Sequence, residues 1–573
     1  MTETTGRLWK REKYRSTSQI NTTDEPPTDN FVSNNYTLLT SEILPRVIVH
    51  LDADCFYAAV ERERLKIPHT TPLAVQQWNS LIAVDYNCRS KGVKRGMLAD
   101  EAKKLIPELR CVHVRLLGEK DEEVSNAQNA KHKEGEECTN DENAKADRGK
   151  QKVSLSRYRT ASFQVMNIFQ RFVNPGDILL RASIDEAYLD LTSSCKRIVE
   201  EHSKQNYDMD MDPLNDEKIH DEEALRKALS VSCVVGSLNT KSPHDRLFIH
   251  AALIVKRIRD AVQNELGYSI SAGIASNKLL AKIGSSKNKP KKQTIIPFRH
   301  APAVLANLPV KGVPGLGGKL GDAVCNFLRD HVKKSSVGPS TDVYNAINFE
   351  IRNSKQQVII KALQYVSETV LKKRFGQSTG SWLHRISHGV DTEILTSRTK
   401  PKSLLAMKSF EPKVSDIEVL EWIEILAGEV HERYLEDKQN FRRRPTNLVL
   451  HHRGARSKDH LKKWKSGDNN ATPTCTIRTA LPNSTLLTEN MIYETGKKLF
   501  FRVSKRLPCT RIGLSMSDFV DLPKEGKGSI KNAFGTFASS ILTFYAKDPN
   551  TRSYSHRKQH KRSTLWSKES YRY

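Results

Sequence analysis

The chain has 573 residues, enough for about three or four domains of ordinary size. It carries 92 Lys and Arg against 66 Asp and Glu, a formal net charge of +26, which favours a polyanionic partner, nucleic acid before a membrane surface. It shows no apolar run of about 18 residues and no apolar signal core, which predicts an intracellular protein, and its nine scattered cysteines contain no CxxC pair, which argues against a zinc finger.

The first part of the chain leads into a predicted strand and helix. Residues 1–43 are polar and are expected to form a flexible leader. The folded pattern then begins at 46–51, RVIVHL, where apolar residues alternate along a strand that changes to a helix near residue 55. This strand delivers Asp52 and Asp54 to its C-terminal end. Asp54 suits a helix cap, whereas Asp52 has no such structural reason and is the better candidate for a ligand.

A basic segment follows a predicted hairpin. Two short apolar runs, 72–75 and 81–84, indicate the hairpin, and the loop after it contains Tyr86, Arg89 and Arg95. Because Arg presents a fork of donors to phosphate oxygens, a nucleotide triphosphate or a nucleic acid backbone could be held there. A solvated basic surface is the alternative.

Two polar stretches interrupt the folded pattern, at about 119–150 and 196–245. Both are rich in charge and poor in large apolar residues, so we expect a solvated insertion at the first and a linker at the second. Between them, apolar residues near helical spacing predict a helix over 154–172, which Pro175 and Gly176 end.

Residues 181–192, RASIDEAYLDLT, place Asp185 and Glu186 side by side in an apolar, strand-like pattern. Ionised carboxylates are costly there unless they are paired, hydrogen-bonded or bound to a metal. Adjacent strand residues point to opposite faces, so both acids can serve one site only if the chain turns or bulges, as in a hairpin whose second arm is 188–191. Solvated acids at a strand end and a functional pair are equal alternatives from this stretch alone.

The pattern becomes regular again after residue 247. An amphipathic helix, a strand and a second helix are predicted up to about residue 290, and the basic exit of that helix includes Lys289, which could reach a phosphate. Residues 308–328 then place four glycines between apolar positions, the composition of a helix-hairpin-helix turn that aims backbone N–H groups at nucleic acid phosphates. A tight turn between packed helices is the equal alternative.

The C-terminal part is predicted to contain a separate module. After mainly helical residues and a basic linker at 398–408, the segment 409–516 alternates strand, helix, strand, helix and strand. Charged flanks on one strand of this α+β module would suit a nonspecific grip on a nucleic acid backbone.

Residues 521–573 are expected to form a disordered basic tail with two short motifs. KGSIKNAFG contains Lys527, Ile530 and Phe534, of which the last two could form a small apolar plug. HRKQHKR, at 556–562, is a candidate nuclear import signal.

Three carboxylates, those of Asp52, Asp185 and Glu186, come from two predicted strands. Such a set suits two divalent metal ions, which can activate an attacking oxygen and stabilise a leaving one in phosphoryl transfer. The basic side chains named above would neutralise the charge of a bound triphosphate.

Five motifs carry a family resemblance: LDADCFYAAVE, IAVDYNCRSKGVKRGM, RASIDEAYLDLT, SAGIASNKLLAKIGSSKNKP and GLGGKLG. Together they resemble the Y family of translesion DNA polymerases, most of all its eta group, over about 47–516. The resemblance implies a multidomain α+β fold in the form of a right hand. The expected domains are a palm at 44–67 and 116–299 with the two polar stretches as insertions, fingers at 68–115, a thumb at 300–390 with the helix-hairpin-helix-like turn, and a little-finger α+β domain at 400–520.

The resemblance also implies an activity, namely template-directed insertion of deoxynucleotides opposite damaged bases such as UV photoproducts. Two Mg²⁺ ions, or Mn²⁺ in their place, would be held by Asp52, Asp185, Glu186 and the backbone carbonyl of Ala53. Tyr57 would be the steric gate that clashes with a 2′-hydroxyl. The remaining contacts implied are Tyr86, Arg89 and Lys289 on the triphosphate, Arg95 over the incoming base and Gln77 on the template base.

The implied partners are primer-template DNA and deoxynucleoside triphosphates, for a monomer in the nucleus without a membrane. The peptide with Lys527, Ile530 and Phe534 resembles a degenerate binding motif for the sliding clamp. No Cys/His finger follows Cys509, which speaks against ubiquitin binding through zinc, and the segment after Trp78 lacks a Gly-rich extension seen in some eta sequences. The alternatives are another Y-family polymerase, kappa-like or iota-like, and a catalytically inert DNA-binding scaffold.

Overall fold

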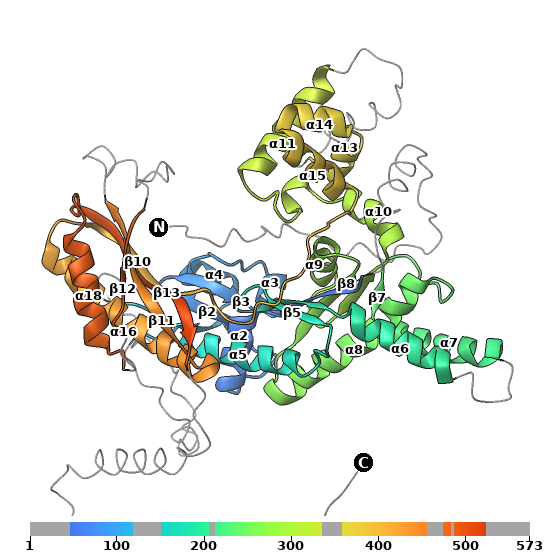
Figure 1. The fold of residues 1–573 in the computed structure, drawn as a ribbon, viewed down its shortest axis with the longest axis horizontal. Helices are drawn as coiled ribbons and strands as arrows, with labels where there is room; N and C mark the ends of the chain where they lie inside the picture. Colours follow the sequence, from blue (N-terminus) through green and yellow to red (C-terminus); the bar gives the residue numbers. More distant parts are fainter. Residues whose placement is uncertain are drawn as a thin grey trace, which may run out of the picture.

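The computed structural model describes residues 46–117, 151–205, 213–334, 358–454, 474–482 and 486–522. Figure 1 shows an elongated arrangement, with a C-terminal unit at one end, a central sheet in the middle and a helical unit projecting from it. The expected leader, the 119–150 insertion and nearly all of the tail lie outside the described residues, as do Lys527, Ile530 and Phe534. None of the described helices is both long and apolar enough to span a membrane.

The central unit is built on a six-stranded mixed sheet in the order β5-β6-β1-β8-β9-β7. β1 is antiparallel to both of its neighbours, and the far edge formed by β8, β9 and β7 is parallel. The strands are β1 (Ile48–Ala53), β5 (Ile178–Arg181), β6 (Glu186–Asp190), β7 (Cys233–Val234), β8 (Ile270–Ala275) and β9 (Gln293–Ile296).

The two faces of this sheet pack against different helices, and the alternation of β1 decides which residue faces which side. Val49 and Leu51 join the core that includes helices α2, α5 and α8, as the sequence predicted. Ile48 faces the opposite core, which includes α9. His50 and Asp52, two and four residues further, share the α9 side. The helices are α2 (Phe56–Arg64), α5 (Ser156–Gln170), α8 (Pro243–Leu266) and α9 (Lys278–Lys287).

The linker predicted at 196–245 is wrong for most of that range. Helix α6 (Thr192–Gln205) continues into it, and α7 (Pro213–Val231), β7 and the start of α8 also lie within it. Ala228 of α7 is fully buried in the core that α8 shares. Ala224 and Leu225 of α7 also pack against this core, so apolar residues of a mainly charged segment hold α7 to the sheet unit.

A small three-stranded sheet, in the order β3-β2-β4, forms a second unit. The predicted hairpin is confirmed as an antiparallel pair of β2 and β3, and β4 adds in parallel. The segment expected to be a basic loop begins instead as a short helix, α3, which Asp85 caps. Its elements are β2 (Leu73–Gln77), β3 (Ser80–Val84), α3 (Tyr86–Ser90), α4 (Ala99–Leu105) and β4 (Arg110–His113).

The helical unit follows the central sheet and shares a core with its α9 side. The glycine-rich segment forms the short helix η4, a turn and the start of α11. Gly315 adopts φ +87° there and lies against the Trp382 ring, so a side chain at this position would be strained and crowded. The helices are η3 (Phe298–His300), α10 (Ala301–Ala306), η4 (Val310–Gly312), α11 (Lys319–Lys334), α13 (Ile360–Gln364), α14 (Glu368–Phe375) and α15 (Gln377–Ser387).

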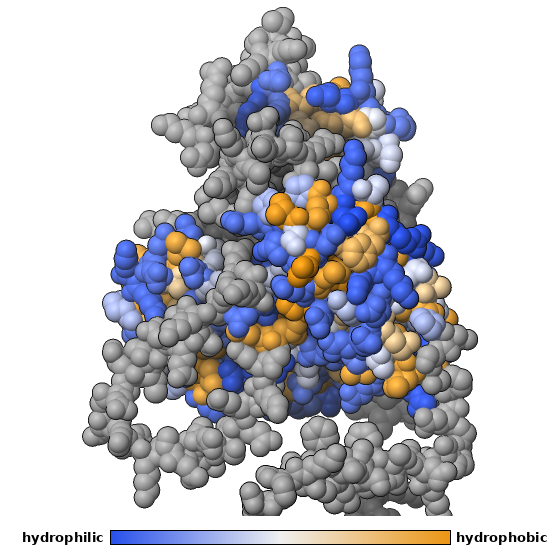
Figure 2. Space-filling model, turned by 90° about the vertical axis from the view of Figure 1, so that its left-hand side faces the viewer, coloured by the Kyte–Doolittle hydropathy of each residue, from blue (hydrophilic) through white to orange (hydrophobic). Residues whose placement is uncertain are grey.

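The C-terminal unit is a four-stranded antiparallel sheet in the order β10-β13-β11-β12, with helices α16 and α18 sharing its core. The five predicted elements are confirmed, and β12 adds to them. The linker prediction for 398–408 is wrong from Ser403 onward, because β10 begins there. The elements are β10 (Ser403–Lys413), α16 (Asp416–Phe441), β11 (Arg443–Gly454), β12 (Cys475–Ala480), α18 (Glu489–Phe501) and β13 (Cys509–Asp521). Among the coloured residues on the face that Figure 2 shows, hydrophilic ones predominate, and hydrophobic ones form patches between them.

Candidate active site

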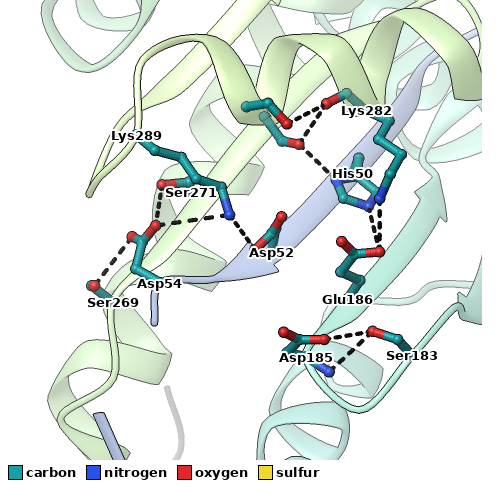
Figure 3. Close-up of polar contacts among 12 residues, drawn as sticks. His50, Asp52, Asp54, Ser183, Asp185, Glu186, Ser269, Ser271, Lys282 and Lys289 are labelled. Atoms are coloured by element: carbon teal, nitrogen blue, oxygen red, sulfur yellow. Dashed lines mark hydrogen bonds and ion pairs between the residues drawn. The ribbon is translucent and has the colours of Figure 1, made fainter. Parts of the chain in front are cut away.

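Strand register brings the predicted acids together. Asp52, next to last in β1, is paired across the sheet with Glu186, the first residue of β6. Asp185 lies in the turn between β5 and β6, where its carbonyl oxygen accepts the Ala53 N–H at 2.9 Å. The predicted hairpin is therefore confirmed. Asp52, which is distant in sequence, meets the adjacent pair Asp185 and Glu186 at one end of the central sheet (Figure 3).

Glu186 has two basic neighbours on the α9 side of the sheet. Lys282 Nζ of α9 donates to Glu186 Oε2 at 2.7 Å, and His50 Nε2 lies 3.7 Å from the same oxygen. Burial alone would raise the pKa of the Glu186 carboxyl, but its interactions with His50 and Lys282 outweigh burial and hold the pKa well below its usual range. Glu186 is therefore ionised at neutral pH.

His50 is held in place beside Glu186 by contacts of its own. Its ring is fully buried, lies 4.5 Å from the Tyr188 ring and shares a hydrogen bond of 2.7 Å between Nδ1 and Ser285 Oγ. Burial lowers the pKa of His50, which favours the neutral ring. The imidazole lies beside Glu186, whose interaction with the ring raises the pKa of His50 in opposition to burial.

Asp52 and Asp54 lie near Lys289 at the same strand end. Lys289 forms an ion pair with Asp52, and its Nζ lies 4.0 Å from Asp54 Oδ1. Asp54 is buried and accepts hydrogen bonds from the Ser269 and Ser271 hydroxyls at 3.1 and 2.8 Å. The helix cap considered for Asp54 is not found, because Cys55 is the residue before α2 and makes no side-chain cap bond.

Asp185 differs from the other two acids in its partner, since its carboxylate accepts a hydrogen bond from the Ser183 hydroxyl at 2.6 Å. Burial raises the pKa of the Asp185 carboxyl, and the negative charges of Asp52 and Glu186 raise it further. At Asp185, therefore, burial and the neighbouring carboxylates together outweigh the positive charge of Lys289.

The aromatic and basic residues implied for the nucleotide are only partly brought together. The Tyr86 hydroxyl donates to Asp54 Oδ1 at 3.3 Å, and the Arg89 guanidinium lies 4.9 Å from the centre of the Tyr86 ring. Tyr57, on the first turn of α2, has a pKa raised by burial and then by Asp185, so it lies near the acids.

Two of the implied contacts come from the small sheet unit. Arg95 is exposed, and its charge also acts on Tyr57. Gln77 ends β2, opposite Ser80 in the hairpin, and is half-buried. The structure thus places Arg95 and Gln77 on the small sheet unit, while the acids and Lys289 belong to the central one.

The donor set fits divalent metal ions. Carboxylate oxygens are the ligands that Mg²⁺ and Mn²⁺ prefer, and here Asp52 lies opposite Glu186 in the strand register with Asp185 next to it. Within the described ranges, no three His, Cys, Asp or Glu side chains converge as a closed ligand group. Asp52 and Glu186 instead pair with Lys289 and Lys282, whose ammonium groups supply positive charge at the positions next to these carboxylates.

His50 and Lys282 are functional candidates that the sequence analysis missed. A signal was present, because His50 precedes Asp52 by two residues and so shares its strand face. Lys282 could be assigned only by knowing that α9 packs across β1, which the sequence pattern does not reveal.

Comparison with known proteins gives two family models that match this chain. The impB/mucB/samB family matches residues 51–286, and the C-terminal domain of the same family matches 401–530. The first covers the acids and α9, and the second covers the C-terminal unit.

Three curated relatives illustrate the similarity. The chain is 31% identical to DNA polymerase eta of Arabidopsis thaliana, over 72% of this chain and 54% of the relative. It is 30% identical to DNA polymerase eta of Drosophila melanogaster, over 71% and 42%, and 29% identical to N-acetyltransferase eso1 of Schizosaccharomyces pombe, over 84% and 49%. The chain thus spans about half the length of these relatives. The two family matches, together with the similarity to the eta polymerases, show that the chain belongs to the impB/mucB/samB family, that is, to the Y family of polymerases, and that it is eta-like.

Proposed function

We propose that the chain is a template-directed DNA polymerase of the translesion type, which inserts deoxynucleotides opposite damaged bases such as UV photoproducts. The observation that carries the proposal is the pairing of Asp52 with Glu186 beside Asp185, with Lys282 and Lys289 against them. Acids on one sheet end with cations beside them suit phosphoryl transfer from a nucleoside triphosphate, in keeping with the relatives that are named DNA polymerase eta.

The four units are proposed to serve as the parts of a right hand. The central sheet would be the palm, the three-stranded unit the fingers, the helical unit the thumb and the C-terminal unit the little finger. The net charge of +26 supports a nucleic acid partner for these surfaces, namely primer-template DNA.

The acids are proposed to hold two Mg²⁺ ions, or Mn²⁺, through Asp52, Asp185, Glu186 and the Ala53 carbonyl. When bound, such ions polarise phosphate oxygens and lower the pKa of an attacking hydroxyl. The primer 3′-oxygen would form a bond to the α-phosphorus of the nucleotide, and the bond from that phosphorus to the β-phosphate oxygen would break to release pyrophosphate.

The chain's own residues would position the nucleotide for this step. Tyr86, Arg89 and Lys289 are proposed to bind the triphosphate, and the proximity of Tyr86, Arg89, Asp54 and Lys289 supports a shared role. Tyr57 would lie under the sugar, Arg95 over the incoming base and Gln77 beside the template base.

Primer extension tests the proposal directly. We expect the purified chain to extend a primer in the presence of Mg²⁺, and the double change Asp185→Asn, Glu186→Gln to abolish extension because it removes two of the three carboxylates. A matched control is Asp177→Asn with Glu265→Gln, two acids of the central unit outside the site, which should leave extension in place. Extension by the site double variant at the wild-type rate would contradict the assignment, and extension by neither protein would favour a DNA-binding scaffold.

Lesion preference separates the eta-like activity from a kappa-like or iota-like one. We propose efficient and accurate insertion opposite a thymine dimer, in keeping with the relatives that are named DNA polymerase eta. A block at the dimer, with extension on undamaged template intact, would favour the other two types.

Two further proposals concern segments outside the described residues. Nuclear location is proposed from HRKQHKR at 556–562 and from the eukaryotic source of the relatives. Clamp binding is proposed for Lys527, Ile530 and Phe534, with the double change Ile530→Ala, Phe534→Ala expected to abolish capture of the sliding clamp in a pull-down. Clamp capture that survives this change would rule the motif out.

A further inference from the structure

A buried arginine of helix α2 lies where the chain passes from the central unit into the small sheet unit. Arg62 is only 7% exposed. Its guanidinium donates to the carbonyl oxygens of Ile67, Pro68 and Thr71, the last at 3.0 Å. These acceptors belong to the segment 65–72, which connects α2 with β2. Because a guanidinium presents several donors in a rigid fork, this one side chain holds the whole connection against α2.

The same guanidinium binds the residue that precedes helix α3. Arg62 Nη2 donates to Asp85 Oδ2 at 2.7 Å, and Asp85 is 8% exposed. Asp85 Oδ2 also accepts from the Leu73 N–H at 3.0 Å. The other oxygen, Oδ1, accepts from the Cys88 N–H at 2.8 Å and so caps α3. One buried carboxylate thus joins α2, the first residue of β2 and the first turn of α3.

Helix α3 carries two of the side chains proposed to bind the triphosphate, Tyr86 and Arg89. The Tyr86 hydroxyl reaches Asp54 at the end of β1. Burial raises the pKa of the Cys55 thiol, and the positive charges of Arg89 and Lys289 oppose that shift, so both cations lie near the residue before α2. A tilt of α3 would therefore move two triphosphate contacts at once relative to Lys289.

We infer that Arg62 and Asp85 are positioning residues that hold α3 against α2 and thereby set the affinity of this chain for the incoming nucleotide. The inference rests on the proposed function and on the triphosphate role proposed for Tyr86 and Arg89. A helix of five residues has little stability of its own, so tertiary contacts decide where α3 lies. A buried ion pair adds little net stability over apolar residues of the same size, but its charge-assisted hydrogen bonds fix geometry.

Two single changes test the pair. Asp85→Ser keeps a good cap for α3 but removes the partner of Arg62, and Arg62→Lys keeps the positive charge but loses the fork. For each we would measure the dissociation constant of the nucleotide and the maximal rate by single-turnover primer extension. Loss of a hydrogen bond between charged groups predicts that each change raises the dissociation constant by about tenfold. The maximal rate should change by less than about twofold, because the acids stay in place and only nucleotide binding is weakened.

Asp437→Ser is the matched control. Asp437 pairs with Arg443 at 2.7 Å in the C-terminal unit, and both side chains are about as buried as those of Arg62 and Asp85. The control change therefore also breaks a buried ion pair, and it should lower the thermal unfolding temperature as the two test changes do. With primer-template DNA at saturation, it should leave the dissociation constant of the nucleotide at the wild-type value.

A combined variant separates positioning from a merely structural role. Tyr86→Ala with Arg89→Ala removes both triphosphate contacts of α3, and adding Asp85→Ser should then weaken nucleotide binding no further, because Asp85 acts through α3. A wild-type dissociation constant in either single variant, or an equal rise with and without the two α3 side chains, would overturn the inference. Absence of primer extension by the wild-type chain would instead refute the proposed function.

Discussion

Asp54 shows how one residue can be essential to a site without being a proposed ligand. Its carboxylate is buried and accepts from two serine hydroxyls of the β8 segment, from the Lys291 backbone N–H at 2.9 Å and from the Tyr86 hydroxyl. It thereby ties the end of β1 to the segment that carries Lys289 and to α3 of the small sheet unit. A buried carboxylate needs such donors to be tolerated at all.

Removing one donor should therefore be costly. We expect Ser271→Ala to lower the free energy of unfolding by about 1 to 3 kcal/mol, because the buried Asp54 carboxylate loses its shortest hydroxyl donor. Ser90→Ala is the control, since Ser90 is exposed and bonds only to the backbone of its own short helix. Equal unfolding midpoints in urea for the two variants would show that Ser271 does not support Asp54.

At the scale of elements, the close approach of α9 to β8 determines where the lysines lie. Gly273 of β8 faces Gly284 of α9, and a Cβ at Gly273 would collide with the backbone of Ala281 and Ser285. Only glycine allows this spacing. Because α9 lies directly on the sheet, Lys282 reaches Glu186 and Ser285 reaches His50.

Gly273→Ala should force α9 away from the sheet. We expect a loss of about 3 kcal/mol in stability, the upper range for overpacking a core, together with reduced primer extension because Lys282 and Ser285 are displaced. Gly317→Ala is the control, since a Cβ there meets only one atom at ordinary contact distance. Thermal unfolding checks both, and a stable, active Gly273→Ala protein would contradict the account of the packing.

At the scale of the whole molecule, charge pairs hold the C-terminal unit against the rest. Glu429 of helix α16 forms an ion pair with Lys152 at 2.9 Å, and Glu436 of the same helix forms one with Arg159 at 3.0 Å. Lys408 of β10 lies 5.5 Å from the Trp78 ring of the small sheet unit and 4.4 Å from the Trp422 ring of α16. The first pair is nearly buried, so its loss should matter more than that of a surface pair.

Reversing one charge should loosen this contact and a swap should restore it. We expect Glu429→Lys to increase the radius of gyration in solution scattering, because Lys152 then faces a like charge in a nearly buried contact. The swap Lys152→Glu with Glu429→Lys should return the wild-type value. If the single variant scatters like the wild-type protein at low salt, this pair does not hold the units together.

Much of the fold could be predicted because its signals are local. Alternation in β1, the helix-spaced residues of α5 and the strand and helix series of the C-terminal unit each depend on neighbours a few residues apart. The failures at 196–245 and at Ser403 have a shared cause. Helices with few apolar residues, and a strand that directly follows the basic stretch 398–402, resemble linkers in composition, and only packing against the rest of the protein stabilises them.

The sequence by itself was enough to single out Asp52, Asp185 and Glu186 as candidate site residues, because a carboxylate inside an apolar strand pattern is costly. Tertiary structure alone decided what surrounds them. Glu186 meets Lys282, and Tyr57 meets Tyr158, across about a hundred residues of chain. Such contacts depend on strand register and on which helix covers which face, and both are fixed by the packing of distant elements rather than by local pattern.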